Sequence, residues 1–103
     1  MPNSQVISTK MTFKELLDLA IEELKELTQV ESPDFRLEQA EFEKSKGVWH
    51  IVVSFLVENV NKRILNIPNG LLGEFKYFRI YKKLKINNQD REVIGLYMFT
   101  NEE

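Results

Sequence analysis

Aromatic and basic side chains occupy one parity of the stretch YFRIYKKLKI, residues 77–86. They would share one face of a strand, because successive side chains of a strand point to opposite faces. Such a ladder offers stacking platforms beside phosphate contacts, as binding of a single-stranded nucleic acid requires. Tyrosines and long cationic side chains are also common on the solvent face of an ordinary sheet. The residues of this ladder are Tyr77, Arg79, Tyr81, Lys83 and Lys85.

The remaining polar residues form no pattern that predicts catalysis or metal binding. His50 is the only histidine, and no partner at a catalytic spacing lies near it in the sequence. Glu22, Glu23 and Glu26 fall on the polar face of a predicted helix, where a solvated surface is expected. The chain has no cysteine, which excludes thiolate catalysis and cysteine-based zinc sites. We therefore expect a non-enzymatic protein with no catalytic residue, cofactor or metal ion.

Length and composition indicate one globular domain. The chain has 103 residues, of which 43% are hydrophobic and 29% charged. We predict an N-terminal extension over residues 1–11, a single α+β domain over residues 12–101 and a C-terminal tail over residues 102–103. The first residues carry no basic stretch followed by an apolar run, and no apolar run approaches the roughly 18 residues that span a bilayer. A cytoplasmic location without membrane contact is expected.

The charges are unevenly distributed along the chain, although the net charge is only −2. Residues 12–45 carry ten acidic and four basic residues, whereas residues 46–85 carry eight basic and two acidic ones. We expect these charges to compensate each other in the fold. An acidic chain also favours a protein partner over nucleic acid.

The segment TFKELLDLAIEELKELTQV, residues 12–30, is predicted to form an amphipathic helix. Its apolar residues recur at spacings of three and four, while Glu and Lys occupy the opposite face. Thr12 and Glu15 have the spacing of a capping box, which marks a helix start. Ser32 and Pro33 are expected to end the helix. The predicted apolar stripe consists of Phe13, Leu16, Leu17, Ala20, Ile21, Leu24 and Leu27.

Four segments then have the alternation of strands. Residues 34–44 change the parity of their apolar residues part-way, which predicts a bulge. Residues 48–58 are apolar on both parities and are predicted to be a central strand. Residues 77–86 and 91–100 follow, the last with Gly95 at its middle. The sequence therefore predicts an α+β fold, with an N-terminal amphipathic helix packed on a four-stranded antiparallel sheet.

The order of elements, with EFEKSKGVWHIVVSF and RIYKKLKINNQDREVIGLY, resembles the small cystatin-like and PepSY-like α+β domains of bacteria. Glu92, Val93 and Ile94 match the residues with which the last strand of those domains resumes. The resemblance extends over residues 12–100. It implies a helix cradled by a curved antiparallel sheet and a binding or inhibitory role, since small immunity proteins that cover a toxin share such architectures.

One helix covers only one face of such a sheet, so we expect the other face to remain partly apolar. The predicted function is a protein-interaction domain, either an inhibitor or immunity-type protein or a homodimer, that acts through this face or through the 59–74 loop. Two alternatives remain: binding of single-stranded nucleic acid through the Tyr77–Lys85 ladder, and a small-ligand pocket under the helix. The predicted interaction residues are Val52, Leu56, Ile67, Leu71, Leu72, Tyr77, Arg79 and Tyr81.

Overall fold

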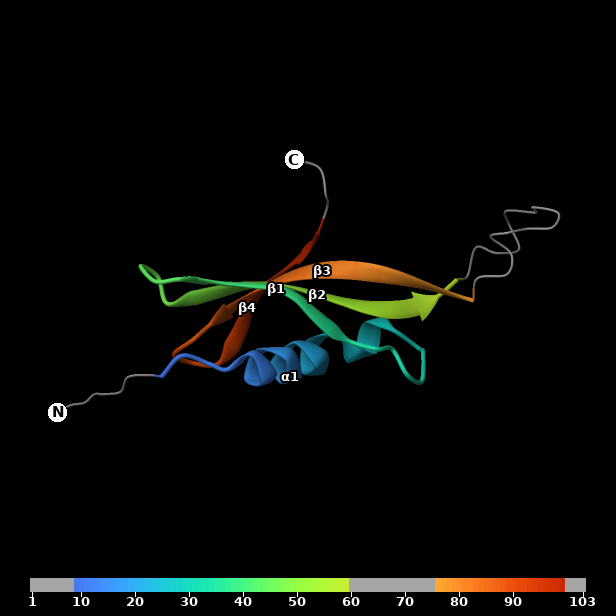
Figure 1. Ribbon diagram of the computed structural model, residues 1–103, viewed down its shortest axis with the longest axis horizontal. Helices are drawn as coiled ribbons and strands as arrows, with labels where there is room; N and C mark the ends of the chain where they lie inside the picture. The colour runs from blue at the N-terminus through green and yellow to red at the C-terminus, as the bar shows by residue number, and fades with distance from the viewer. Residues whose placement is uncertain (1–8, 60–75, 100–103) are drawn as a thin grey trace.

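The computed structural model describes residues 9–59 and 76–99, where one helix packs against one face of a four-stranded antiparallel sheet (Figure 1). The strands follow one another in the sheet in chain order, β1-β2-β3-β4. This architecture confirms the predicted α+β class. Within the described residues, no helix is long and apolar enough to cross a membrane. The elements are α1 (Phe13–Leu24), the 3-10 turn η1 (Lys25–Leu27), β1 (Arg36–Glu43), β2 (Val48–Glu58), β3 (Tyr77–Asn87) and β4 (Glu92–Met98).

The predicted capping box starts α1, but the helix ends earlier than predicted. The Thr12 hydroxyl accepts from the Glu15 amide at 3.1 Å, and the Thr12 amide donates to the Glu15 carboxylate at 2.9 Å. At the other end the backbone becomes extended at Thr28. The Thr28 hydroxyl donates to the backbone carbonyl of Leu56 at 2.7 Å, which ties the chain to β2. This long-range bond, together with the β-branched side chain, redirects the chain before Ser32 and Pro33 are reached.

The core lies between α1 and the centre of the sheet. Of the expected helix stripe, Leu16, Ala20 and Leu24 are buried in the core and Leu17 packs against it, whereas Ile21 is only half-buried and Phe13 and Leu27 are 64% and 47% exposed. Phe13 occupies the first helical turn and meets Trp49 edge-on, with ring centroids 6.4 Å apart. Leu27 lies in η1, where the geometry no longer follows the helical stripe. The fully buried core residues are Leu16, Ala20, Leu24, Ile51, Val53, Phe55, Leu84 and Ile86.

Asn88, in the turn between β3 and β4, fixes the segment that precedes the helix. Its side-chain oxygen accepts from the Trp49 indole N–H at 3.1 Å and from the Met11 amide at 2.9 Å. Its amide nitrogen donates to the Thr9 carbonyl at 3.2 Å. Asn88 is only 6% exposed, and these bonds compensate for the burial of its polar atoms.

The strand registers confirm two features of the sequence pattern. β2 has the predicted bounds and lies inside the sheet, between β1 and β3. The pairing of β1 with β2 shifts between Leu37 and Gln39, at the place where the apolar parity changes. A second shift, in the pairing of β3 with β4, falls between Lys85 and Ile86.

We predict that Leu24→Ala lowers the free energy of unfolding by about 2–5 kcal/mol, because it removes buried methyl groups and leaves a cavity. Urea unfolding followed by Trp49 fluorescence measures the change. Glu23→Ala, on the exposed side of the same helical turn, is the control and should change the midpoint little. An unchanged midpoint in Leu24→Ala would show that this face of α1 does not pack on the sheet.

Candidate functional site

The candidate site is the sheet surface opposite α1, hereafter the open face. The register and the alternation of side chains define it, because Trp49, Ile51, Val53 and Phe55 of β2 point toward the helix. β1 contributes mainly carboxylates to this face, and β3 contributes mainly cations and tyrosines. The rows at its centre are Glu41, His50, Lys85 and Gly95; Gln39, Val52, Lys83 and Tyr97; and Arg36, Ser54 and Tyr81.

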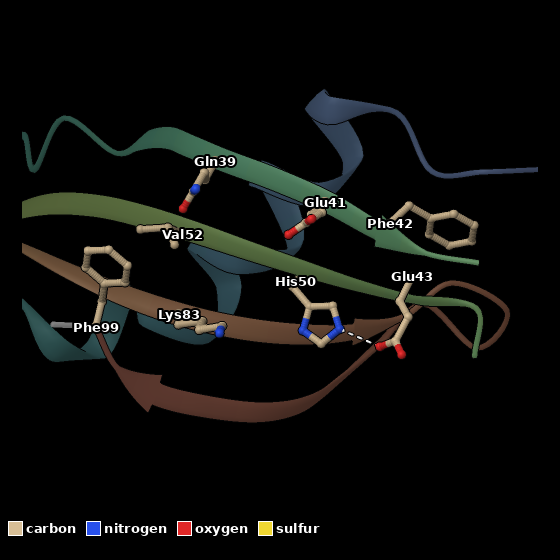
Figure 2. A pocket seen from close by; sticks show the side chains of 8 residues that line it. All are labelled: Gln39, Glu41, Phe42, Glu43, His50, Val52, Lys83 and Phe99. Carbon is tan, nitrogen blue, oxygen red and sulfur yellow. Dashed lines mark hydrogen bonds and ion pairs between the residues drawn. The ribbon is translucent and has the colours of Figure 1, made fainter. Parts of the chain in front are cut away.

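A groove of about 450 Å³ crosses the open face (Figure 2). Gln39, Val52 and Lys83 form one row across it, on three neighbouring strands. Val52, a predicted interaction residue, is only 5% exposed, and the long side chains of Gln39 and Lys83 lie on either side of it. The expected apolar patch at this position is therefore largely covered. The groove is lined by Gln39, Glu41, Phe42, Glu43, His50, Val52, Lys83 and Phe99.

One end of the groove is a charged cluster around Glu43. The His50 Nε2 atom lies 2.8 Å from the Glu43 carboxylate, and Figure 2 shows the two side chains facing each other. This hydrogen bond lowers the pKa of Glu43 below its ordinary value, and the charges of Lys46 and Lys85 act in the same direction. No hydroxyl or thiol nucleophile occurs among the described residues that line the groove. The cluster is thus a carboxylate hydrogen-bonded to a histidine, with two lysines close enough to act on its charge.

Arg79, a predicted interaction residue, forms bonds within the protein at the other end of the open face. Its guanidinium donates to the Ser54 hydroxyl at 2.8 Å, and to the backbone carbonyl and carboxylate of Asp34 at 3.0 and 2.5 Å. Ser54 is fully buried and donates to Glu38 at 2.6 Å. The Arg79 side chain is 18% exposed. It therefore links β3 to β2 and to the segment before β1, and little of it is left to meet a partner.

Asp34 accepts a second guanidinium, that of Arg36, at 2.7 Å. This hydrogen bond lowers the pKa of Asp34, and the charges of Arg36 and Arg79 add to the effect. Asp34 has a positive φ of 56°, a conformation that aspartate and asparagine tolerate better than most residues. A charged residue with an unusual backbone conformation therefore anchors the start of β1 to β3.

Tyrosines are the most exposed aromatic residues of the open face. Tyr77 and Tyr81, both predicted interaction residues, are 47% and 41% exposed. Tyr81 contacts Phe99, with ring centroids 6.2 Å apart. The structure thus extends the aromatic surface of β3 to Phe99, the residue after β4, which is not among the predicted interaction residues.

Tyr97 also lies on the open face, although it is not among the predicted interaction residues. A Cβ atom at Gly95 would lie 2.6 Å from the Tyr97 ring, so the ring covers the glycine. The Lys85 ammonium lies 5.6 Å from the centre of the same ring, within the range of a cation–π contact. A glycine two residues before an aromatic residue in one strand was the available signal, since aromatic rings often cover strand glycines.

Of the remaining predicted interaction residues, only Leu56 lies among the described residues. Leu56 is half-buried, and its backbone carbonyl and amide bond to the Thr28 hydroxyl and the Pro33 carbonyl. Ile67, Leu71 and Leu72 lie outside the described residues. Among the residues that are described, no group of three histidines or carboxylates could hold a metal ion.

No protein-family model matches the chain, and no curated protein or solved structure matches it significantly. The fold class therefore rests on the structure itself. The resemblance to cystatin-like and PepSY-like domains stays a prediction, and so does the function it implies.

We predict that Asp34→Asn flattens the dependence of stability on pH in acid. The pKa of Asp34 is lowered in the folded state, so its contribution to stability is present above the unfolded pKa, near 4, and is lost as the pH falls through the folded pKa. Asparagine keeps the backbone conformation accessible but does not titrate. Urea midpoints measured from pH 7 to pH 2 should show a smaller loss below about pH 4 in the variant than in the wild type.

Asp18→Asn, at an exposed aspartate of α1, is the matched control for this measurement. It should retain the acid-dependent loss of the wild type. Identical pH profiles for Asp34→Asn and the wild type would contradict a stabilising role for the ionised Asp34.

Proposed function

We propose that the chain is a non-enzymatic protein-interaction domain that binds a protein partner through the open face, as an inhibitor or immunity-type protein does. One observation carries the proposal: Tyr77, Tyr81 and Tyr97 are each between 41% and 47% exposed on the face that the helix leaves uncovered. Tyrosine supplies a large apolar area with a polar end and is enriched at protein interfaces. We also propose a cytoplasmic location, on the sequence grounds given above.

The charges of the open face support a protein partner of mixed charge. Glu41 and Glu43 lie on the β1 side of the groove, and Lys83 lies on the β3 side. A partner segment that enters the groove would bring a basic group toward β1 and an acidic group toward β3. Such complementarity contributes to specificity and to the rate of association.

The same charges argue against the alternative of single-stranded nucleic acid. Arg79, the guanidinium of the ladder, is bonded to Asp34 and Ser54. Lys85 lies over the Tyr97 ring and close enough to Glu43 to lower its pKa. A phosphate chain along β3 would therefore meet fewer free cations than the sequence suggests, and carboxylates lie two strands away.

The alternative of a small-ligand pocket under the helix has less support than the open face. Leu16, Ala20 and Leu24 of α1 are fully buried, as are the sheet residues Ile51 and Phe55 with which they form the core. These side chains fill the space where such a ligand would lie. The groove of the open face is on the other side of the sheet.

We predict that a photoreactive phenylalanine analogue at position 81 or 97 forms a covalent adduct with one defined protein in cells that express the chain. The adduct should resist nuclease treatment, because the partner is a protein. Mass spectrometry of the adduct identifies the partner. The same analogue at position 23, on the exposed side of α1, is the control and should not form this adduct.

Affinity for the captured protein then tests the tyrosines individually. Tyr81→Ala and Tyr97→Ala should each weaken binding about tenfold or more, as expected of central interface aromatics. Phe13→Ala removes an aromatic side chain that is 64% exposed but lies on the helix, and it should leave affinity unchanged. Equal effects of all three substitutions, or a nuclease-sensitive adduct, would contradict the proposal.

A further inference from the structure

Among the described residues, the outer edge of β4 is a second surface without a partner. Within the described ranges, 9–59 and 76–99, β4 pairs only with β3. An edge strand presents a row of unpaired backbone N–H and C=O groups, and another strand is the partner that satisfies them most completely. The edge of β4 is therefore suited to bind an extended backbone segment.

The side chains of β4 make this edge unusually apolar. Ile94 is 52%, Leu96 43% and Met98 71% exposed. Glu92, the first residue of the strand, is its only charged residue. An exposed apolar edge strand readily pairs with another chain.

The opposite edge of the sheet, β1, differs in charge. Each edge strand carries one register shift, so a bulge does not distinguish them. β1 places four charged residues along its eight, whereas β4 has one in seven. Charged residues on an edge strand are a common protection against pairing, and two copies of β1 would bring like charges together. The charged residues of β1 are Arg36, Glu38, Glu41 and Glu43.

We infer that the β4 edge binds the β4 edge of a second copy of this chain, antiparallel and about a two-fold axis. Two copies of a nearly uncharged strand meet without like-charge repulsion, and the unpaired backbone groups of one match those of the other. In this arrangement the sheet continues across both copies.

The ends of the strand add charge complementarity to this pairing. Glu92 begins β4, whereas Lys82 and Lys83 of β3 pair with Met98 and Tyr97, at its end. Antiparallel pairing brings Glu92 of one copy toward the lysine-bearing end of the other. The partner is thus a second copy, and this surface is separate from the open face.

Light scattering after size exclusion tests the inference on the intact chain. The wild type should elute at twice the chain mass of 12.2 kDa. The double variant Ile94→Lys/Met98→Lys should elute at the mass of one chain, because lysines on an edge disfavour strand pairing. Both positions are more than half exposed, so the monomer should remain folded, as circular dichroism can verify. Gln39→Lys, at an exposed position of β1, should leave the dimer intact.

Three results would overturn the inference: a wild-type monomer at high micromolar concentration, a dimer that survives the double variant, or open-ended assemblies instead of a closed pair. A dimer that also dissociates with Gln39→Lys would likewise place the contact elsewhere. A wild-type monomer or open-ended assemblies would leave the open-face proposal standing, because that proposal is tested with a different partner and at positions 81 and 97. Dissociation with Gln39→Lys would instead implicate the open face, because Gln39 lines its groove.

Single-cysteine variants give a second, geometric readout, since the chain has no cysteine of its own. Facing residues of an antiparallel pair have Cα atoms roughly 4.5–5.5 Å apart, a separation that a disulfide can bridge. Ile94→Cys or Leu96→Cys, near the middle of β4, should form a covalent dimer under mild oxidation. Gln39→Cys on β1 should not. A covalent dimer that forms equally from β1 and β4 would contradict pairing through β4.

Discussion

In the part of the chain that the structure describes, the fold depends on one twelve-residue helix, α1, which covers one face of the four-stranded sheet. On that face Leu16, Ala20 and Leu24 complete a dry core. The other face has no helix among the described residues, so its own side chains must cover it. Gln39 and Lys83 lie on either side of Val52, and Arg79 and Glu38 bond to Ser54. β2 is consequently buried on both faces although only one of them is packed against α1.

This arrangement determines which surfaces remain for binding. The ends of the open face are occupied by internal bonds, those of Glu43 with His50 and of Arg79 with Asp34. Between and beside them the tyrosines of β3 and β4 remain exposed. At the edges of the sheet, the charged residues of β1 disfavour pairing with another strand, whereas β4 carries only one charged residue. The β4 edge is therefore a second surface that can bind. We propose a different partner for each of these two surfaces, a foreign protein for the open face and a second copy for the β4 edge.

Local patterns in the sequence predicted the helix and the strands well, but they could not predict contacts between residues far apart in the chain. The capping box at Thr12, the bounds of β2 and the bulge in β1 all depend on neighbouring residues and were correctly predicted. The early helix end at Thr28 depends on a bond to residue 56, and the internal role of Arg79 depends on a residue 45 positions away. The spacing of residues along the sequence could not identify the bonding partner of Thr28 or that of Arg79. The position of the Tyr97 ring over Gly95 was foreseeable in principle, because it is local.

We propose that the helix leaves two unlike surfaces and that the β4 edge pairs with a second copy. Amide hydrogen exchange at low and high protein concentration tests it most directly, because it reports each strand separately. We expect slow exchange in β2 at both concentrations. In β4, exchange should slow as the protein concentration rises, while exchange in β1 stays constant. Exchange from β4 that is independent of concentration, or that changes equally in β1, would contradict it.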